Sequence, residues 1–239
     1  MRVLDQLRKV KRRYLALRGL DVRYTPQIEH PYEELGALAG VWCVNTAALA
    51  RGGIAYSFGI GTDISFEEDL MNSTQVELHA FDPTPRSLAW LRSRPLPSRI
   101  SIHDYGISDS DGTARFFAPA NVAHVSFSMR HHALPTDAGT VCSVYRLATI
   151  MEKLGHAKLD LLKMDIEGAE YAVLQDVVRS GLSIPQILVE FHHRWSRSDV
   201  ALTDQTIRML NEHGYRIYHV SPTGMEYSFV QSSPEAANE

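Results

Sequence analysis

Short apolar runs alternate with helical patterns along most of this chain, and the alternation constrains the fold more than any other feature. The strand-like runs are GIAYSFGIG (53–61), QVELHAFD (75–82), SRISIHDYGIS (98–108), LDLLKMD (159–165) and PQILVEFHH (185–193). Several are apolar on both faces, as buried parallel strands must be. Helical patterns lie at 34–51, 64–72, 85–93, 146–154, 168–180 and 199–213. This order predicts an α/β fold with a doubly wound, mostly parallel sheet.

The last pattern, YRIYHVSPTGMEYSFV at 215–230, is interrupted by a Ser-Pro-Thr-Gly turn. Such a turn predicts an antiparallel hairpin at the end of the sheet. We therefore expect a basic helix and linker at 1–35, one α/β domain at 36–232 and a frayed tail at 233–239.

Residues 1–18 are strongly basic, with seven Lys or Arg side chains against one acid, Asp5. Apolar residues recur among them at helical spacing: Val3, Leu4, Leu7, Val10, Tyr14 and Leu17. We expect a helix packed on its own domain with its basic face in water. Contact of residues 1–18 with a membrane surface or an acidic partner is the alternative. Because the whole chain has a net charge of −4, the remainder is acidic, which argues against nucleic-acid binding.

The two cysteines, Cys43 and Cys142, are far apart and fit no metal-binding spacing. We expect free thiols in a reducing compartment, and hence a cytoplasmic protein. No run approaches the apolar length of a membrane span, and the N-terminus lacks the features of a signal peptide.

The segment SFGIGTDIS at 57–65 follows the first strand and opens a helix. Gly59 and Gly61 allow close approach of a ligand to the backbone, and the helix start offers free N–H groups. The spacing is not GxGxxG, and Asp63 would repel a pyrophosphate, which disfavours a nicotinamide cofactor. A zwitterion such as the methionine end of S-adenosylmethionine is tolerated, because its ammonium pairs with an acid. A tight structural turn is the plainer alternative.

The ends of the second and third strands carry the next candidates. Asp82 follows the glycine loop by about 20 residues, where a carboxylate accepts the ribose hydroxyls of an adenosine. Its alternative role is to cap the next helix. Asp104, Gly106 and Ile107 lie where an adenine would be framed, on position alone. Segment 117–143, with His124, His131 and His132, has no clear period and is expected to form a lid.

Acidic residues gather in LLKMDIEGAEYAVL (161–174), just where a buried strand stops. Ligands of doubly wound sheets lie outside the carboxyl ends of the strands, so Asp165 and Glu167 are expected to face the site. Gly168 lets the turn tighten into the helix. Glu170 lies in the first helical turn, where capping or pairing is the expected role.

The fifth strand ends in VEFHHRW, where alternation places Glu190 and His192 on one face and His193 on the other. A histidine suits removal of a proton from an attacking alcohol, so His192 is the candidate base and His193 the reserve. Arg194 and Trp195 are expected to shape the acceptor pocket. Asp165, Glu167 and His192 also suit a divalent metal, which is possible but not favoured.

These motifs together point to one family. LLKMDIEGAEYAVL, with YSFGIGTDISFE, AFDPTP, DSDGTARF and ILVEFHHRW, resembles the FkbM family of S-adenosylmethionine-dependent methyltransferases over about residues 50–230. The resemblance implies a Rossmann-like class I methyltransferase: a seven-stranded, mostly parallel sheet with helices on both faces and one antiparallel strand near its edge. It also implies methyl transfer, most often to an oxygen of a sugar or natural product, with S-adenosylhomocysteine as the product.

The chain departs from the family pattern at the first loop, where most members have an acid at Ser57 and a glycine at Asp63. We expect Ser57 among the cofactor contacts and Asp63 to take over the contact with the ammonium. The departure motivates an alternative, a non-catalytic binding protein that keeps the fold. N-methylation is a further alternative, although MDIEGAE lacks the Asn/Asp-Pro-aromatic pattern of such enzymes. The acceptor, a small molecule of unknown identity, and the oligomeric state stay open.

Overall fold

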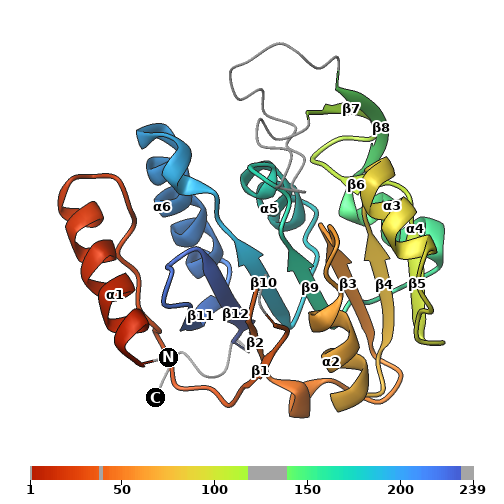
Figure 1. The fold of residues 1–239 in the computed structure, drawn as a ribbon, viewed down its shortest axis with the longest axis horizontal. Coiled ribbons are helices and arrows are strands. Elements are labelled where there is room, and N and C mark those ends of the chain that lie inside the picture. The colour runs from red at the N-terminus through yellow and green to blue at the C-terminus, as the bar shows by residue number, and fades with distance from the viewer. Residues whose placement is uncertain (1, 38–39, 118–138, 233–239) are drawn as a thin grey trace.

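A seven-stranded sheet forms the centre of the molecule in the computed structural model, which describes residues 2–37, 40–117 and 139–232 (Figure 1). Its strands follow the order β11-β12-β10-β9-β3-β4-β5. Their bounds are Ile54–Phe58 (β3), Glu77–Phe81 (β4), Ile100–His103 (β5), Leu161–Met164 (β9), Gln186–Glu190 (β10), Tyr215–Val220 (β11) and Glu226–Gln231 (β12). Strand β12 runs antiparallel to both of its neighbours, and the other pairings are parallel. The predicted fold class is confirmed, including the terminal hairpin.

Helices cover both faces of this sheet. Alternate strand residues point to opposite sides, and both sets are apolar, so both faces need to be covered. On one face, Tyr56 and Leu162 share a core with α4 (Leu147–Leu154), α5 (Glu170–Arg179) and α6 (Arg197–Glu212). On the other face, Ala55 and Leu161 pack with α2 (Ser65–Ser73). Helix α3 (Pro85–Arg92) packs beside it, on Ala80. The parallel strands point upward in Figure 1, so their carboxyl ends form its upper edge.

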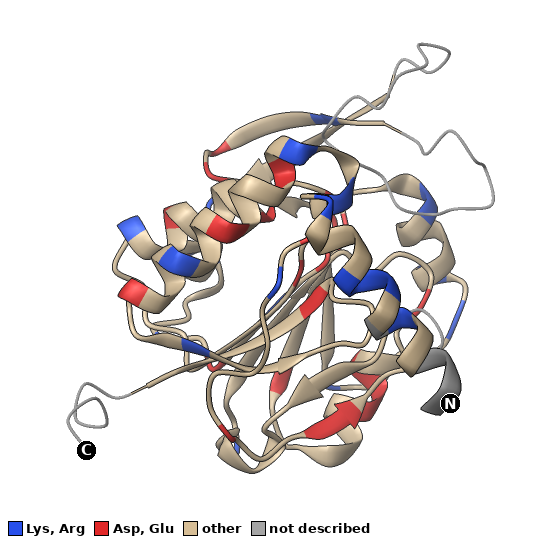
Figure 2. Cartoon of the chain, turned by 90° about the vertical axis from the view of Figure 1, so that its left-hand side faces the viewer, with Lys and Arg blue, Asp and Glu red and all other residues tan. Residues whose placement is uncertain are grey.

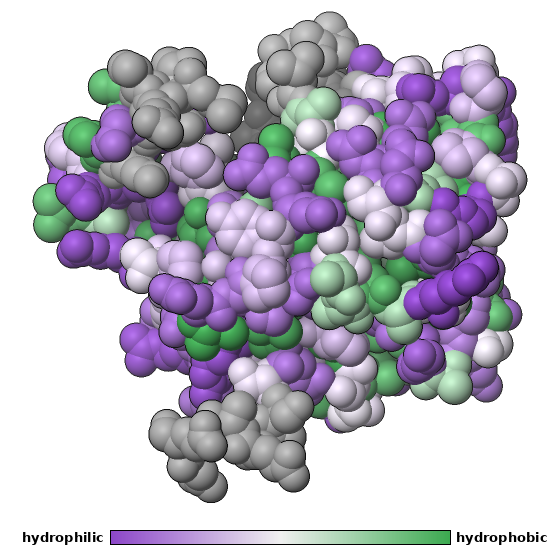
Figure 3. Space-filling model, turned by 90° about the horizontal axis from the view of Figure 1, so that it is seen from below, coloured by the Kyte–Doolittle hydropathy of each residue, from purple (hydrophilic) through white to green (hydrophobic). Residues whose placement is uncertain are grey.

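The helix expected at 34–51 is wrong. The chain there forms a small antiparallel pair, β1 (Glu33–Leu35) and β2 (Trp42–Val44), and a short 3₁₀ turn, Thr46–Ala48. The buried carbonyl of Cys43 accepts hydrogen bonds from the Tyr218 and Ser228 hydroxyls. Tertiary packing of an aromatic and β-branched segment has outweighed its helical spacing. Figure 3 shows the molecule from below, with hydrophilic and hydrophobic side chains mixed over that face.

A second small sheet follows β5. It contains β6 (Gly106–Ile107), β8 (Thr140–Tyr145) and β7 (Gly112–Phe116), in that order. The strand expected at 98–108 is thus divided after His103, and its second part joins the small sheet. Most of the expected lid at 117–143, with its three histidines, lies outside the described residues.

Helix α1 (Arg2–Leu17) confirms the expected basic helix, but several of its apolar side chains are exposed rather than packed on the domain. Leu7, Val10 and Tyr14 are between 58% and 61% exposed, and Leu17 is 84% exposed. Arg12 instead faces the domain and donates to the carbonyl oxygen of Ser221. Figure 2 shows the basic residues along this helix. Within the described ranges, no helix combines the length and apolar character needed to cross a bilayer.

Candidate active site

A pocket opens at the carboxyl ends of β3, β4 and β9, where the sequence predicted a ligand. Eight of its lining residues are among the predicted site residues: Gly59, Gly61, Asp63, Asp82, Gly106, Ile107, Asp165 and Glu167. Three loops far apart in the sequence therefore meet at one edge of the sheet, as parallel topology requires. Phe58, Phe81 and Phe116 give the same pocket apolar walls.

Gly59 sets how closely two of these loops approach. Its φ is +79°, and a Cβ atom there would lie 1.7 Å from the carbonyl oxygen of Asp165. Any side chain at this position would drive the loop after β3 away from the loop after β9. The backbone N–H of Gly59 donates to the carbonyl oxygen of Phe81, 3.1 Å away, so β4 is tied to the same loop.

Asp82 is 5% exposed and joins the glycine loop to the start of α3. Its Oδ2 accepts from the N–H of Gly61 at 2.9 Å, and its Oδ1 accepts from the N–H and hydroxyl of Thr84 at 2.9 and 2.6 Å. A carboxylate offers about four acceptor positions, so one remains for a ligand in the pocket. The structure thus shows the turn-holding role and leaves the ribose contact as a prediction.

Asp63 lies on the pocket wall at the start of α2. Its Oδ1 accepts from the backbone N–H of Ser65 at 2.9 Å. The carboxylate therefore stands where a helix start would otherwise attract an anion, as the sequence predicted.

Two expected cofactor residues are corrected. Ser57 is completely buried and donates to Oε1 of Glu67 on α2, away from the pocket. Asp104 is exposed and lines a different depression, beside Leu88 and Arg92 of α3. Each side chain points to the other side of its strand or loop from the cofactor pocket.

A buried polar network beneath the glycine loop was missed by the sequence analysis. Burial raises the pKa of Glu67, and the nearby Lys163 ammonium opposes that rise. Lys163 donates to the carbonyl oxygen of Gly59 at 3.1 Å. A lysine inside an apolar strand, LLKM, was the available signal, because a buried charge needs a partner.

The turn after β9 holds strain. Glu167 has a φ of +50°, a region that L-residues rarely adopt, and Gly168 follows at +95°. Glu170 accepts from the N–H of Gly168 at 2.7 Å and from the N–H of His192 at 2.8 Å. The expected capping and pairing role of Glu170 is confirmed, and it fastens this turn to the end of β10.

His192 lies at the centre of an acidic cluster. Its Nε2 is 3.3 Å from Glu167, 3.6 Å from Asp165 and 3.8 Å from Glu190. Its Nδ1 lies 3.4 Å from Glu170. Burial alone would lower the pKa of His192, but contact with Glu170 and the charges of the other acids raise it to about 10. Burial and the charge of Asp165 raise the pKa of Glu190 to about 8.

His193 is turned the other way, as the alternation predicted. Its ring is fully buried, and its Nε2 lies 2.7 Å from Oδ1 of Asp21. Arg194 pairs with the same carboxylate at 2.6 Å. The reserve role of His193 as a base and the pocket role of Arg194 are therefore corrected to a structural one. Trp195 does lie beside the site, with its ring 5.1 Å from that of His192.

The metal alternative receives a modified ligand set. Asp165, Glu190 and His192 each offer one ligand atom, and these atoms lie within 4.8 Å of one another. Glu190 thus takes the place of Glu167 in the set expected from the sequence. Metal binding there stays a prediction.

This sheet order, with one antiparallel strand next to the edge and a pocket at the strand ends, is the arrangement of class I methyltransferases. The chain belongs to the FkbM methyltransferase family: its residues 45–217 match the family model described as the methyltransferase FkbM domain. The family suspected from the motifs is confirmed, and with it S-adenosyl-L-methionine as the cofactor.

Two curated relatives are similar to most of this chain. The chain is 27% identical over 174 residues to the probable methyltransferase-like protein 24 of Rattus norvegicus, a match that covers 69% of this chain and 42% of the relative. The Homo sapiens protein matches equally, with 41% of its length covered. The chain thus spans about two fifths of the length of these relatives.

Two solved structures align with about three quarters of this chain. The methyltransferase FkbM from Methylobacillus flagellatus KT aligns with a TM-score of 0.46 and 16% identity, over 75% of this chain and 43% of that one. SMU.1697c, a putative methyltransferase from Streptococcus mutans in complex with SAH, aligns with a TM-score of 0.41 and 8% identity, over 77% and 90%.

Proposed function

We propose that this chain is an S-adenosylmethionine-dependent methyltransferase that acts on a hydroxyl group of a small molecule, such as a sugar or a natural product. One observation carries the proposal: the carboxylates of Asp165 and Glu167 line the cofactor pocket and also pair with His192. A group that accepts a proton therefore lies next to the place where a methyl donor binds. A binding protein without catalysis has no need of such a cluster.

The pocket residues fit the cofactor. Gly59 has no Cβ atom, so the loop after β3 lies directly against the loop after β9. The backbone of Gly61 lines the pocket beside it. Asp63 would hold the ammonium of the cofactor, Asp82 the ribose hydroxyls, and the backbone of Gly106 and Ile107 the adenine. These assignments place an acid at the ammonium and at the ribose of the cofactor, and apolar walls around the rest of the cofactor.

The bound cofactor supplies a methyl group already activated by a positively charged sulfur. The chain then has to orient the acceptor hydroxyl and take its proton. A ring with a pKa of about 10 carries a proton at neutral pH, so His192 is a cation in the resting site. The first proton acceptor is therefore Asp165 or Glu167, and His192 stabilises and positions that carboxylate. This modifies the expected role of His192 as the base itself.

The dependence of kcat on pH separates the two roles. A carboxylate base gives a rate that is nearly constant from pH 7 to 9. A histidine base with a pKa of about 10 gives a rate that rises about tenfold per pH unit over this range. The rising profile would restore His192 as the base.

Transfer of a labelled methyl group to a panel of sugars, glycosides and phenols tests the activity, and calorimetry with S-adenosylhomocysteine tests cofactor binding. We expect binding and transfer to at least one hydroxyl acceptor. Failure to bind the product at millimolar concentration would end the proposal. Binding with transfer only to amines would favour N-methylation, and binding without transfer to either class would favour the non-catalytic alternative.

The two cysteines are free and buried, which supports the expected cytoplasmic location.

We also propose that α1 rests on an anionic lipid surface. Its exposed apolar stripe of Leu7, Val10, Tyr14 and Leu17 is flanked by exposed basic residues, including Lys11 and Arg13. An apolar stripe with basic flanks suits the interface of a charged membrane. Co-sedimentation should occur with vesicles rich in phosphatidylserine and fall when Leu7 and Leu17 are changed to serine. Equal sedimentation of that variant would contradict the proposal.

A further inference from the structure

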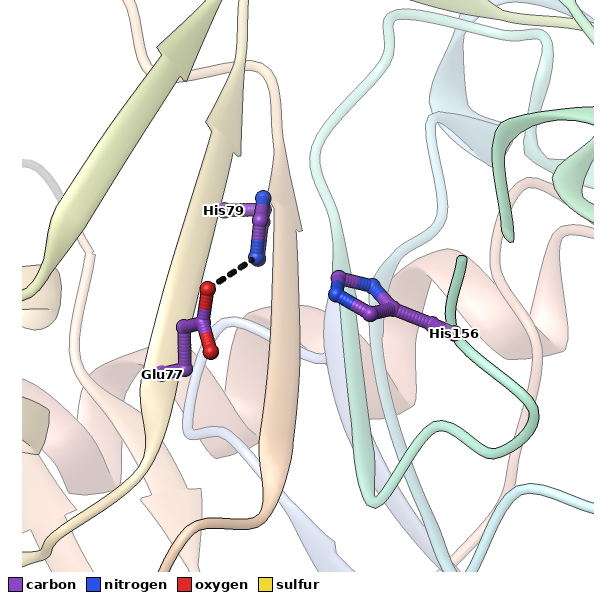
Figure 4. A group of neighbouring side chains, drawn as sticks. All are labelled: Glu77, His79 and His156. Atoms are coloured by element: carbon purple, nitrogen blue, oxygen red, sulfur yellow. Dashed lines mark hydrogen bonds and ion pairs between the residues drawn. The ribbon is translucent and has the colours of Figure 1, made fainter. Parts of the chain in front are cut away.

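A second group of chemically active side chains lies outside the cofactor pocket, on and beside β4. Glu77 and His79 extend from the strand, and His156 extends toward them from the loop that follows α4 (Figure 4). His79 precedes Asp82 by three residues, which places it roughly 10 Å down the strand from the pocket edge. None of the motifs that identify the methyltransferase includes these residues.

The three side chains have the spacing of metal ligands. One ligand atom from each lies within 4.8 Å of the others, and Nε2 of His79 is 3.2 Å from Oε1 of Glu77. Donors about 2.0–2.1 Å from a tetrahedral zinc ion lie roughly 3.3 Å apart, which the His79–Glu77 pair already matches. His156 follows Gly155, which ends α4 with a φ of +74°, so a small movement of the loop closes the remaining distance.

A second layer of hydrogen bonds orients both imidazoles. Nδ1 of His79 lies 2.9 Å from Nε2 of His103, and Nδ1 of His156 lies 2.6 Å from the hydroxyl of Tyr56. With the proton on each Nδ1, both Nε2 lone pairs are free to bind a metal. Metal-binding histidines in proteins are commonly fixed in this way by a partner on the other nitrogen.

Burial and charge also suit a cation. His79 is 5% exposed, whereas the Glu77 side chain is 56% exposed, so the cluster opens to water on one side. The Glu77 carboxylate supplies the negative charge of the cluster, beside the imidazoles of His79 and His156.

We propose that Glu77, His79 and His156 bind a divalent transition-metal ion of the zinc type, with water as the fourth ligand. Two imidazoles and a carboxylate are a donor set that zinc accepts, and an open fourth position is compatible with the exposed side. The ion would fasten the loop after α4 to β4. This inference does not depend on the proposed methyl transfer.

Metal titration of the chelator-treated full chain tests the site. We expect Co²⁺ to give the visible absorption of a tetrahedral complex, and Zn²⁺ to displace it with one equivalent. His156→Gln should weaken zinc binding by more than about 100-fold, and Tyr56→Phe, which removes only the orienting bond, by about 10- to 100-fold. Glu77→Gln is a second ligand variant with little risk to folding, because Glu77 is exposed.

Two control variants fix the location. His213→Gln removes an exposed histidine whose Nδ1 lies 2.8 Å from the Met209 carbonyl oxygen, and this variant should bind zinc as the wild type does. Glu190→Gln alters the other metal-capable cluster and should keep the Co²⁺ spectrum. Absence of a tetrahedral spectrum in the wild type would overturn the proposal. So would wild-type affinity in both His156→Gln and Glu77→Gln, or loss of the spectrum in Glu190→Gln alone.

Discussion

Two histidine clusters lie in different environments along the parallel strands, and these environments shift the pKa values of the rings in opposite directions. Beyond the end of β10, His192 is surrounded by acids, which raise its pKa to about 10. At the end of β5, burial and the neighbouring His79 ring lower the pKa of His103 to about 4. The same type of side chain thus favours its protonated form in one cluster and its neutral form in the other, so its neighbours decide its chemistry.

The difference is already present in the order of residues along the strands. Asp165, Glu167 and Glu190 lie at or beyond strand ends, where the chain is free to turn toward a ligand. His79 and His103 lie within or at the end of neighbouring strands and stack on each other, with ring centroids 5.2 Å apart. The acids at the strand ends thus suit the proposed proton transfer, and the imidazoles of His79 and His156 with Glu77 suit the proposed zinc site.

The largest effect is expected when the acids are removed from the upper cluster. Asp165→Asn combined with Glu167→Gln should lower kcat by about 10²- to 10⁴-fold, because the proton acceptor is lost. The pKa of His192, measured by nuclear magnetic resonance, should be lower in the double variant than in the wild type. Asp109→Asn, an exposed acid in a loop, is the control and should change neither quantity. Full turnover in the double variant would remove both carboxylates from the mechanism.

Gly59→Ala tests the close approach of the loop after β3 to the loop after β9. The new Cβ would meet the Asp165 carbonyl oxygen, so affinity for S-adenosylhomocysteine should fall by more than about 100-fold and unfolding should become easier by about 3 kcal/mol. Gly52→Ala is the matched control: its φ is +73°, but no atom lies within 4 Å of the added Cβ. It isolates the cost of the backbone angle from the clash. Equal losses in both variants would contradict the close approach of the two loops.

Zinc binding at the lower cluster should survive Gly59→Ala wherever that variant stays folded by circular dichroism. The reason is that none of the proposed metal ligands lines the cofactor pocket. A parallel loss of zinc affinity in a folded variant would show that the clusters are linked.

The smallest effect is on the pH dependence of stability. A histidine with a lowered folded-state pKa binds its proton more readily when unfolded, so His103 should cost stability as pH falls from about 6.5 toward 4, by up to about 3 kcal/mol. The raised pKa of His192 acts in the opposite direction. Its contribution is present below about 6.5 and is lost as pH rises toward about 10.

Urea unfolding of His103→Gln and His192→Gln across this range measures how the free energy of unfolding depends on pH. His103→Gln should reduce the loss of stability at acidic pH, and His192→Gln should reduce the loss at alkaline pH. The same change of slope in both variants would mean that the two environments do not differ as described.

Much of this architecture follows from the sequence, for identifiable reasons. Buried parallel strands require apolar runs, and their ends must meet, so Asp165, Glu167 and His192 could be placed together before the structure was known. Alternation along VEFHH also separated His192 from His193 correctly.

Other features depend on contacts between distant segments. Ser57 faces α2 because Glu67, ten residues later, supplies the carboxylate that accepts a hydrogen bond from its hydroxyl. The pair Glu77 and His79 shows the spacing of one strand face, but its third partner, His156, comes from a loop after α4. The strands at 33–44 form because the carbonyl of Cys43 meets Tyr218 and Ser228, which no local pattern reveals.

The most direct test of the central claim is a crystal structure of the chain with S-adenosylhomocysteine. We predict that the ribose hydroxyls contact Asp82 and that the sulfur faces the side of the pocket formed by Asp165 and Glu167, with His192 behind them. Density for the ligand in any other depression, or a sulfur turned away from these carboxylates, would contradict the account.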